Sequence, residues 1–422
     1  MNKTPLLAVA AATSIAAILS SCSTAPSGAS SDGSVTITYA YWGNNSENAT
    51  LTAMINDFEQ ANPKITVKAN WIQNDYLQQL QTQLAGGKPP TVAQISNTDL
   101  AAFASSFKVA NVNPSAYYSA NIPNAMKIQG KYYATPFVAK TKVMAINTKL
   151  WQAAGLDVPS KSTPMNVEDF IANAKKLTKG SGKSKQYGSA PLWFGGWLTV
   201  NGGNNYNTDG TSCTLGSPEA IQAADQVIAS QTKDGFTPTL LDAQGQDMFD
   251  WLSIGRLAAQ PDFGPWNIAQ LISLKNASDF ALVPDPGKGE PMEVDGLAVT
   301  KNSKQAETDA ANKFISFMST NQQAQERLTT KESSLGVPVV QSAVPAFEKA
   351  APDQNLQAFV DGVDQAPITA SVKANTKIST DWQTALTDKT AIGSGNQSPA
   401  SVLPELSKQC QATLDAAGPA IS

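Results

Sequence analysis

Tryptophan side chains stand beside amide and carboxylate groups in three segments whose glycine, proline and asparagine residues are typical of loops. The groups are Trp42 with Asn44 and Glu47, Trp193 and Trp197 with Asn201 and Asn204, and Trp266 with Asp262 and Asn267. A flat aromatic ring stacks on apolar C–H faces, while amides and carboxylates hydrogen-bond hydroxyl groups. This combination is typical of a site for a neutral, hydroxyl-rich ligand such as an oligosaccharide. The alternative for each tryptophan is packing in the hydrophobic core.

Two further polar residues follow a short apolar run that predicts a buried strand. Asn97 and Asp99 come directly after this run, which spans 92–95. Ligands of α/β sheets bind outside the carboxyl ends of the strands, so we expect both side chains to reach a ligand. The tryptophans at 71, 151 and 251 fall within strand or helix patterns, and we assign these to the core.

The chain contains no histidine. This excludes the Ser-His and Cys-His nucleophile pairs, His-ligated zinc and the usual general base near neutral pH. The net charge of −4 provides no basic surface for nucleic acid. The glycine pairs at 195–196 and 202–203 stand in no phosphate-binding pattern. We therefore predict no metal, no cofactor and no nucleic-acid partner.

Strand and helix patterns alternate from residue 35 onward. The predicted order is strand 35–42, helix 47–60, strand 65–71, a helix starting at Asp75, strand 92–95 and a helix ending at Phe103. Within the first helix, Leu51, Met54, Ile55 and Phe58 recur at the spacing of one amphipathic face. This alternation is typical of a parallel sheet covered by helices.

The first 21 residues have the pattern of an export signal. Lys3 precedes an apolar stretch at 6–19, which is too short and too rich in alanine to favour a membrane-spanning helix. The sequence Leu-Ser-Ser-Cys at 19–22 resembles the cleavage site of bacterial lipoprotein signals. That resemblance implies cleavage before Cys22 and attachment of lipid, palmitate included, to this residue; secretion without an anchor is the alternative. The Ser-, Ala- and Gly-rich residues 22–34 predict a flexible tether.

Cysteine occurs at only two other positions, 213 and 410. In an exported protein, two remaining cysteines predict one disulfide, here between Cys213 and Cys410. Two free buried thiols are the alternative.

The segment 130–156 resembles a known family. It reads GKYYATPFVAKTKVMAINTKLWQAAGL and is similar to the "G-x-Y-Y-x-x-P … Y-N-x-x-L-F-x-x-A-G-L" segment of extracellular solute-binding protein family 1, the sugar-binding lipoproteins of ABC importers. The same family's order of a strand, a tryptophan, a helix and "F-x-x-x-N/H-P-x-I-x-V" is matched by Trp42, Phe58, Asn62, Pro63, Ile65 and Val67.

The resemblance implies an α/β fold of the periplasmic-binding-protein type, class II, with two lobes joined by a multi-segment hinge. Each lobe is expected to hold a mainly parallel sheet flanked by helices. The implied parts are a signal peptide at 1–21, a tether at 22–34, lobe 1 at 35–143 plus 297–337, and lobe 2 at 144–296 plus 338–422.

The resemblance also implies a function without a catalytic step. We expect a monomer, lipid-anchored through Cys22 on the extracytoplasmic face of the cell membrane, that binds a carbohydrate and delivers it to ABC importer permease subunits. A polyol or peptide ligand stays open, as does a secreted glycoside-acting enzyme, which needs two carboxylates facing each other across a cleft. The residues expected to bind the ligand are Trp42, Asn44, Glu47, Asn97, Asp99, Phe137, Trp193, Trp197, Asn204, Asp262, Trp266 and Asp295.

Overall fold

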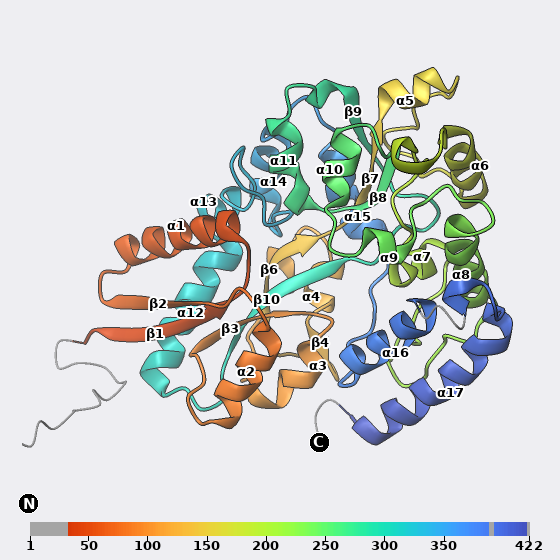
Figure 1. The fold of residues 1–422 in the computed structure, drawn as a ribbon. Coiled ribbons are helices and arrows are strands. Elements are labelled where there is room, and N and C mark those ends of the chain that lie inside the picture. The colour runs from red at the N-terminus through yellow and green to blue at the C-terminus, as the bar shows by residue number, and fades with distance from the viewer. Residues whose placement is uncertain (1–32, 388–391, 420–422) are drawn as a thin grey trace, which may run out of the picture.

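The computed structural model describes residues 33–387 and 392–419, and these residues form an α/β molecule with two main sheets and a short two-stranded one (Figure 1). The predicted signal peptide and Cys22 lie outside the described residues. None of the described helices is long and apolar enough to cross a membrane.

The first lobe is built on a five-stranded sheet of order β2-β1-β3-β10-β6. Its strands are β1 (Val35–Tyr41), β2 (Ile65–Trp71), β3 (Val92–Ser96), β6 (Thr135–Lys140) and β10 (Glu293–Val299). Strand β1 is parallel to β2 and β3, whereas β10 is antiparallel to its neighbours β3 and β6. A short antiparallel hairpin, β4 (Lys127–Ile128) with β5 (Lys131–Tyr132), accompanies this sheet.

The second lobe holds a three-stranded sheet of order β8-β7-β9. Its strands are β7 (Val143–Asn147), β8 (Ala259–Phe263) and β9 (Phe280–Val283). Both pairings of β7 are antiparallel, so the expectation of a mainly parallel sheet is wrong for this lobe. The reason is that β7 enters directly from the other lobe and lies between β8 and β9, which run parallel to each other. Strand β10, which enters the first sheet from the second lobe, likewise runs against its neighbours.

The chain crosses between the sheets at residues 141–142, directly after β6, and again between β9 and β10. The lobe boundaries expected at 143/144 and 296/297 fall inside β7 and β10, and each of these strands pairs with one sheet only. Val337 forms an isolated bridge with Ala139, beside the first crossing. The assignment of the other segments to lobes stays a prediction.

The alternation of strands and helices predicted for the first part of the chain is confirmed. Its helices are α1 (Asn45–Ala61), α2 (Tyr76–Ala85) and α3 (Leu100–Phe103), the last continued by the short 3₁₀ helix η1 (Ala104–Ser106). Helix α1 buries Leu51, Met54, Ile55 and Phe58, the face that its sequence spacing predicts, in one core with Phe314 of α12 (Gln305–Thr320). Each such side chain stabilises the lobe by roughly 1.5–3 kcal/mol. Figure 1 shows α1 and α12 beside β1 and β2.

The remaining helices complete both lobes. They are α4 (Asn121–Asn124), α5 (Thr148–Ala153), α6 (Val167–Leu177), α7 (Phe194–Val200), α8 (Pro218–Gln231), α9 (Leu240–Ala243), α10 (Met248–Ser253), α11 (Ile268–Ser273), α13 (Gln322–Glu326), α14 (Val344–Lys349), α15 (Gln357–Gln365), α16 (Asn375–Thr387) and α17 (Pro399–Ala417). A disulfide joins Cys213 to Cys410 with 6.0 Å between the Cα atoms. It ties α17 to the loop that precedes α8, and α17 and α8 contribute to one hydrophobic core.

Candidate functional site

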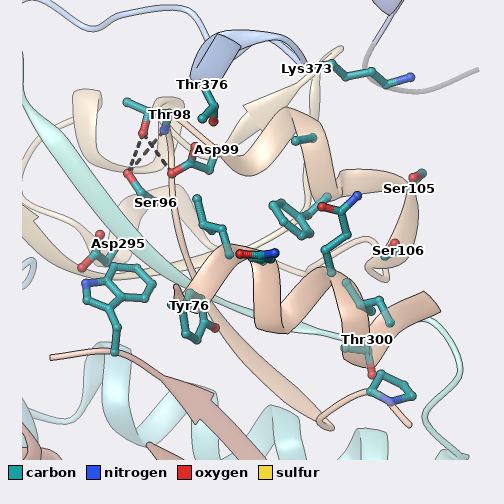
Figure 2. Close-up of a pocket in the computed structure, with 18 of the residues that line it drawn as sticks. Tyr76, Ser96, Thr98, Asp99, Ser105, Ser106, Asp295, Thr300, Lys373 and Thr376 are labelled. Carbon is teal, nitrogen blue, oxygen red and sulfur yellow. Dashed lines mark hydrogen bonds between the residues drawn. The ribbon is translucent and has the colours of Figure 1, made fainter. Parts of the chain in front are cut away.

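A cavity of about 1310 Å³ opens at the carboxyl ends of β1 and β3 (Figure 2). These parallel strands end at the same edge of the sheet, and β10 begins there because it runs in the opposite direction. Helix α16 closes the other side with Thr376, and this helix packs on α7 through Trp382 and Phe194. The lining residues between the two sides are Trp42, Ser96, Thr98, Asp99, Lys140, Glu293, Asp295, Lys373 and Thr376. This is the edge at which α/β sheets bind ligands.

Trp42 forms an aromatic wall of the cavity. It follows the last residue of β1 and is half-buried, with its ring centroid 4.9 Å from that of Tyr76. The ammonium nitrogen of Lys140 lies 5.5 Å from the same ring centroid. These two contacts hold the indole in one orientation while the side chain still borders the cavity. A ring held in this way is a platform for the apolar face of a ligand.

Lys140 and Asp295 form an ion pair on neighbouring strands at the floor of the cavity. The lysine nitrogen lies 2.6 Å from Oδ2 of Asp295, and Gln94 donates a hydrogen bond to the same oxygen. Burial raises the pKa of Asp295. Burial also acts to lower the pKa of Lys140, but the attraction of Asp295 outweighs it, so the pKa of Lys140 is raised above its usual value. Oδ1 of Asp295 has no hydrogen-bond partner within the described part of the chain. It is an acceptor available to a ligand hydroxyl.

Asp99 is the second carboxylate of the cavity wall. Burial, and next the negative charge of Glu293, raise the pKa of Asp99 to about 6. Its side chain accepts one long hydrogen bond, 3.5 Å, from the hydroxyl of Thr98, and no ion pair between described residues includes it. A carboxylate with unused acceptor positions can bind two ligand hydroxyls.

Asn97 positions the loop that follows β3. Its side-chain oxygen accepts the N–H of Val294, and its own backbone N–H donates to the Val294 carbonyl, both at 2.9 Å. Its side chain is 1% exposed. Asn97 therefore fixes the loop after β3 to β10, which carries Asp295, and does not line the cavity.

Lys142 links the cavity to carboxylates of the second lobe. Its nitrogen lies 2.9 Å from Asp262, 3.4 Å from Glu290 and 3.8 Å from Glu293, the last of which borders the cavity. Asp262, near the end of β8, has a φ of 60°, a strained conformation for this residue type. Burial, then Asp262, raises the pKa of Glu290 well above its usual value. Within the described residues no cluster has the arrangement of a metal site.

The structure uses Asn44 and Glu47 in a helix cap. The Asn44 side chain accepts the N–H groups of Ser46 and Glu47 at 2.9 Å, and Glu47 accepts the Asn44 N–H at 2.7 Å. This is a capping box at the start of α1. Neither side chain lines the cavity.

Two aromatic residues expected at the ligand are buried instead. Phe137 is fully buried in the core of the first lobe. Trp197 is 1% exposed, packs on Phe170 and donates its indole N–H to Gln226 at 2.6 Å. Both rings pack in the hydrophobic core and offer no surface to a ligand, so we leave them out of the proposed site.

The other expected residues of the second lobe lie apart from the cavity lining. Trp193, which precedes α7, is 43% exposed, and Trp266, in the 3₁₀ helix η4 (Pro265–Asn267), is 36% exposed. Asn204 accepts the N–H of Asn205 with its side chain, which stabilises a turn. The structure thus brings Trp42, Asp99 and Asp295 together in one cavity. Asp262 is connected to the edge of the cavity by Lys142, which pairs with Asp262 and with the lining residue Glu293.

The sequence analysis did not single out Lys140, Lys142 or Glu293. The sequence does contain a signal for the two lysines: both stand in the otherwise largely apolar run 136–146, where a buried charge needs an ion-pair partner. Lys373 and Thr376 had no such signal, since only the folded chain brings them to the cavity.

Comparison with known proteins agrees with this geometry. The sequence model of the bacterial extracellular solute-binding protein family matches residues 42–325, more than half of the chain. The chain belongs to this family.

Individual solute-binding proteins are similar over most of the length. A multiple sugar-binding protein of Streptococcus mutans is 24% identical over 364 residues, which cover 80% of this chain and 83% of the relative. An ABC substrate-binding protein of Listeria monocytogenes, solved in complex with cycloalternan, has a TM-score of 0.76 at 25% identity and covers 90% of this chain and 99% of that one. The GacH receptor of Streptomyces glaucescens has a TM-score of 0.75 at 22% identity, and the match covers 90% of this chain and 99% of the receptor. These likenesses establish the two-lobe periplasmic-binding-protein fold.

Proposed function

We propose that this protein binds a carbohydrate in the cleft between its lobes and delivers it to the permease subunits of an ABC importer. One observation carries the proposal: a fixed indole, Trp42, and the carboxylates Asp99 and Asp295 border the same cavity. The indole offers a stacking surface for sugar C–H groups, and the carboxylates accept hydrogen bonds from sugar hydroxyls. No step of this function makes or breaks a covalent bond.

The relatives support the same class of ligand. The Listeria protein was solved in complex with cycloalternan, the GacH receptor in complex with acarbose, and the Streptococcus relative is named for multiple sugars.

Binding is coupled to delivery by closure of the lobes. Short crossings join the lobes. At the first crossing, Lys140 pairs with Asp295 of the first sheet, and Lys142 pairs with Asp262 of the second sheet and with Glu293 of the first. A ligand that contacts both lobes stabilises the closed arrangement and shifts the population toward it. We propose that Asp262, Trp193 and Trp266 form the second wall of the cleft upon closure, and that the permease recognises the closed form.

Isothermal titration calorimetry with a panel of mono- and oligosaccharides tests ligand binding. We expect at least one sugar to bind, and Trp42→Ala to weaken its binding by about tenfold or more while the protein stays folded, because the stacking surface is lost. Binding of a polyol or peptide but of no sugar would refute the proposal. Release of a shorter sugar by the purified protein would refute the absence of catalysis.

A matched pair of tryptophan variants tests the second wall. Trp266→Ala should lower the affinity, whereas Trp251→Ala should leave it unchanged, because Trp251 stacks on Tyr187 away from the cavity lining. Equal affinities of both variants and the unaltered protein would remove Trp266 from the site.

The anchor and the oligomeric state are part of the same proposal. We propose lipid attachment at Cys22 after removal of residues 1–21, and a monomer on the extracytoplasmic face of the membrane. Metabolic labelling with a fatty acid should mark the unaltered protein and fail on Cys22→Ser. Light scattering of the purified protein should give the mass of one chain, and a dimer mass would contradict the second part.

A further inference from the structure

The cavity continues beyond the cleft, along helix α2. Its lining runs from Trp42 and Asp295 past Tyr76 to Ser105 and Ser106 of η1. Figure 2 shows Asp295 and Ser105 at opposite ends of this lining, with α2 between them. We call the outer part the α2 groove; it is defined by Leu77, Gln78, Gln81, Leu84, Ser105 and Ser106.

One face of α2 forms the first wall of the groove. Residues 77, 78, 81, 84 and 85 line it at the three- and four-residue spacing of a single helix face. The second wall comes from α3 and η1 through Phe103 and Ser105, and residues 300–302 after β10 lie at its outer end. All of these residues belong to the segments around the first sheet, so closure of the lobes leaves the groove unchanged.

The groove carries unused hydrogen-bonding groups. The side chains of Gln78, Gln81 and Ser105 are exposed, and no hydrogen bond between described residues uses them. Leu77, Leu84 and Phe103 add apolar surface between them. Alternating amide, hydroxyl and apolar groups match the hydroxyls and C–H faces of a sugar chain, as at the inner end of the cavity.

The size of the cavity points to a long ligand. Its 1310 Å³ exceeds the roughly 300–1,000 Å³ of pockets that enclose one small molecule. A monosaccharide at Trp42 would leave the α2 groove empty. The charged lining residues Asp99, Lys140, Glu293 and Asp295 border the inner end, and Asp75, Lys301 and Lys373 are the other charged groups of the lining. The six residues that define the α2 groove are all uncharged, so the groove suits neutral units.

We propose that the α2 groove binds the distal units of an oligosaccharide whose first units occupy the cleft between the lobes. This inference rests on the proposed carbohydrate-binding function and adds chain length as a determinant of specificity. Because the groove lies on one lobe, the distal units bind before closure and add affinity to both the open and closed forms.

Calorimetry with two homologous series, maltose to maltohexaose and diacetylchitobiose to its hexamer, tests the proposal on the full chain. In a series that binds, the affinity should increase by about tenfold or more beyond the disaccharide, the effect of one or two added hydrogen bonds. The double variant Gln78→Ala, Gln81→Ala should reduce this gain to less than about twofold while the disaccharide binds as before.

Two further variants separate the groove from the rest of the site. Gln79→Ala changes the same residue type on the same helix outside the lining and should keep the full gain. Ser105→Trp should block the groove and abolish the gain. Equal or weaker binding of longer sugars to the unaltered protein overturns the proposal, as does a gain that survives in both groove variants. If another sugar binds but no member of either series does, the same variants are tested on that sugar and its longer homologues. If no sugar binds, the proposed carbohydrate-binding function is refuted.

Discussion

Lowering the pH from about 7.5 to about 5 should weaken sugar binding about tenfold, because Asp99 then binds a proton that the ligand must displace. In the free protein, burial and then Glu293 raise the pKa of Asp99 to about 6 from its ordinary 3.8. Ligand hydroxyls that donate to the carboxylate favour its ionised form, so the bound state has the lower pKa. The affinity is therefore fully present above pH 6 and declines as the pH falls below it.

The magnitude follows from linkage. At about pH 5 roughly nine-tenths of the free Asp99 would be protonated. A ligand that returns its pKa to the ordinary 3.8 keeps the bound carboxylate ionised at this pH, and the difference is the expected tenfold loss. The charged groups that act on Asp99 are Glu293 and Asp295, the latter paired with Lys140.

Calorimetric titrations across this pH range measure the effect. Asp99→Asn should bind more weakly at neutral pH and show a nearly flat profile, while Asp353→Asn, at an exposed position outside the cavity, should keep the full dependence. A profile that is equally steep in Asp99→Asn would refute the assignment of the titrating group.

Three stability predictions accompany it. Lys140→Met should lower the free energy of unfolding by about 3–5 kcal/mol in urea titrations, because the buried Asp295 loses its counter-charge; adding Asp295→Leu should restore much of it. Removing the disulfide by Cys213→Ser and Cys410→Ser should cost about 2–4 kcal/mol, and reductant should then no longer shift the melting temperature. Trp197→Ala should cost about 3–5 kcal/mol in the same assay, and a loss of sugar affinity without a loss of stability would contradict its burial.

Local patterns predicted the first part of the fold well. The spacing of Leu51, Met54, Ile55 and Phe58 gives the buried face of α1, because helix periodicity is a local property. The direction of β7 was missed. Strand direction depends on which lobe the chain comes from, and no local pattern contains that information.

The site was predicted in part for the same reason. Asp99 follows a strand end and reaches the cavity, whereas Asn44, close to Trp42, is used by a helix cap. The residue types at a loop predict what chemistry it can supply. They do not show whether those groups instead cap a nearby helix or pack in the hydrophobic core.

The sequence by itself determined the class of chemistry and the order of elements in the first lobe: no histidine for catalysis, aromatic and amide groups in loops, and alternating strands and helices. The tertiary structure decided which groups meet. Lys140 reaches Asp295, and Thr376 reaches the side of Asp99, only because strands distant in the chain pair in one sheet and α16 packs over its edge. The α2 groove is likewise a product of packing, since its two walls come from separate helices whose distance the sequence does not specify.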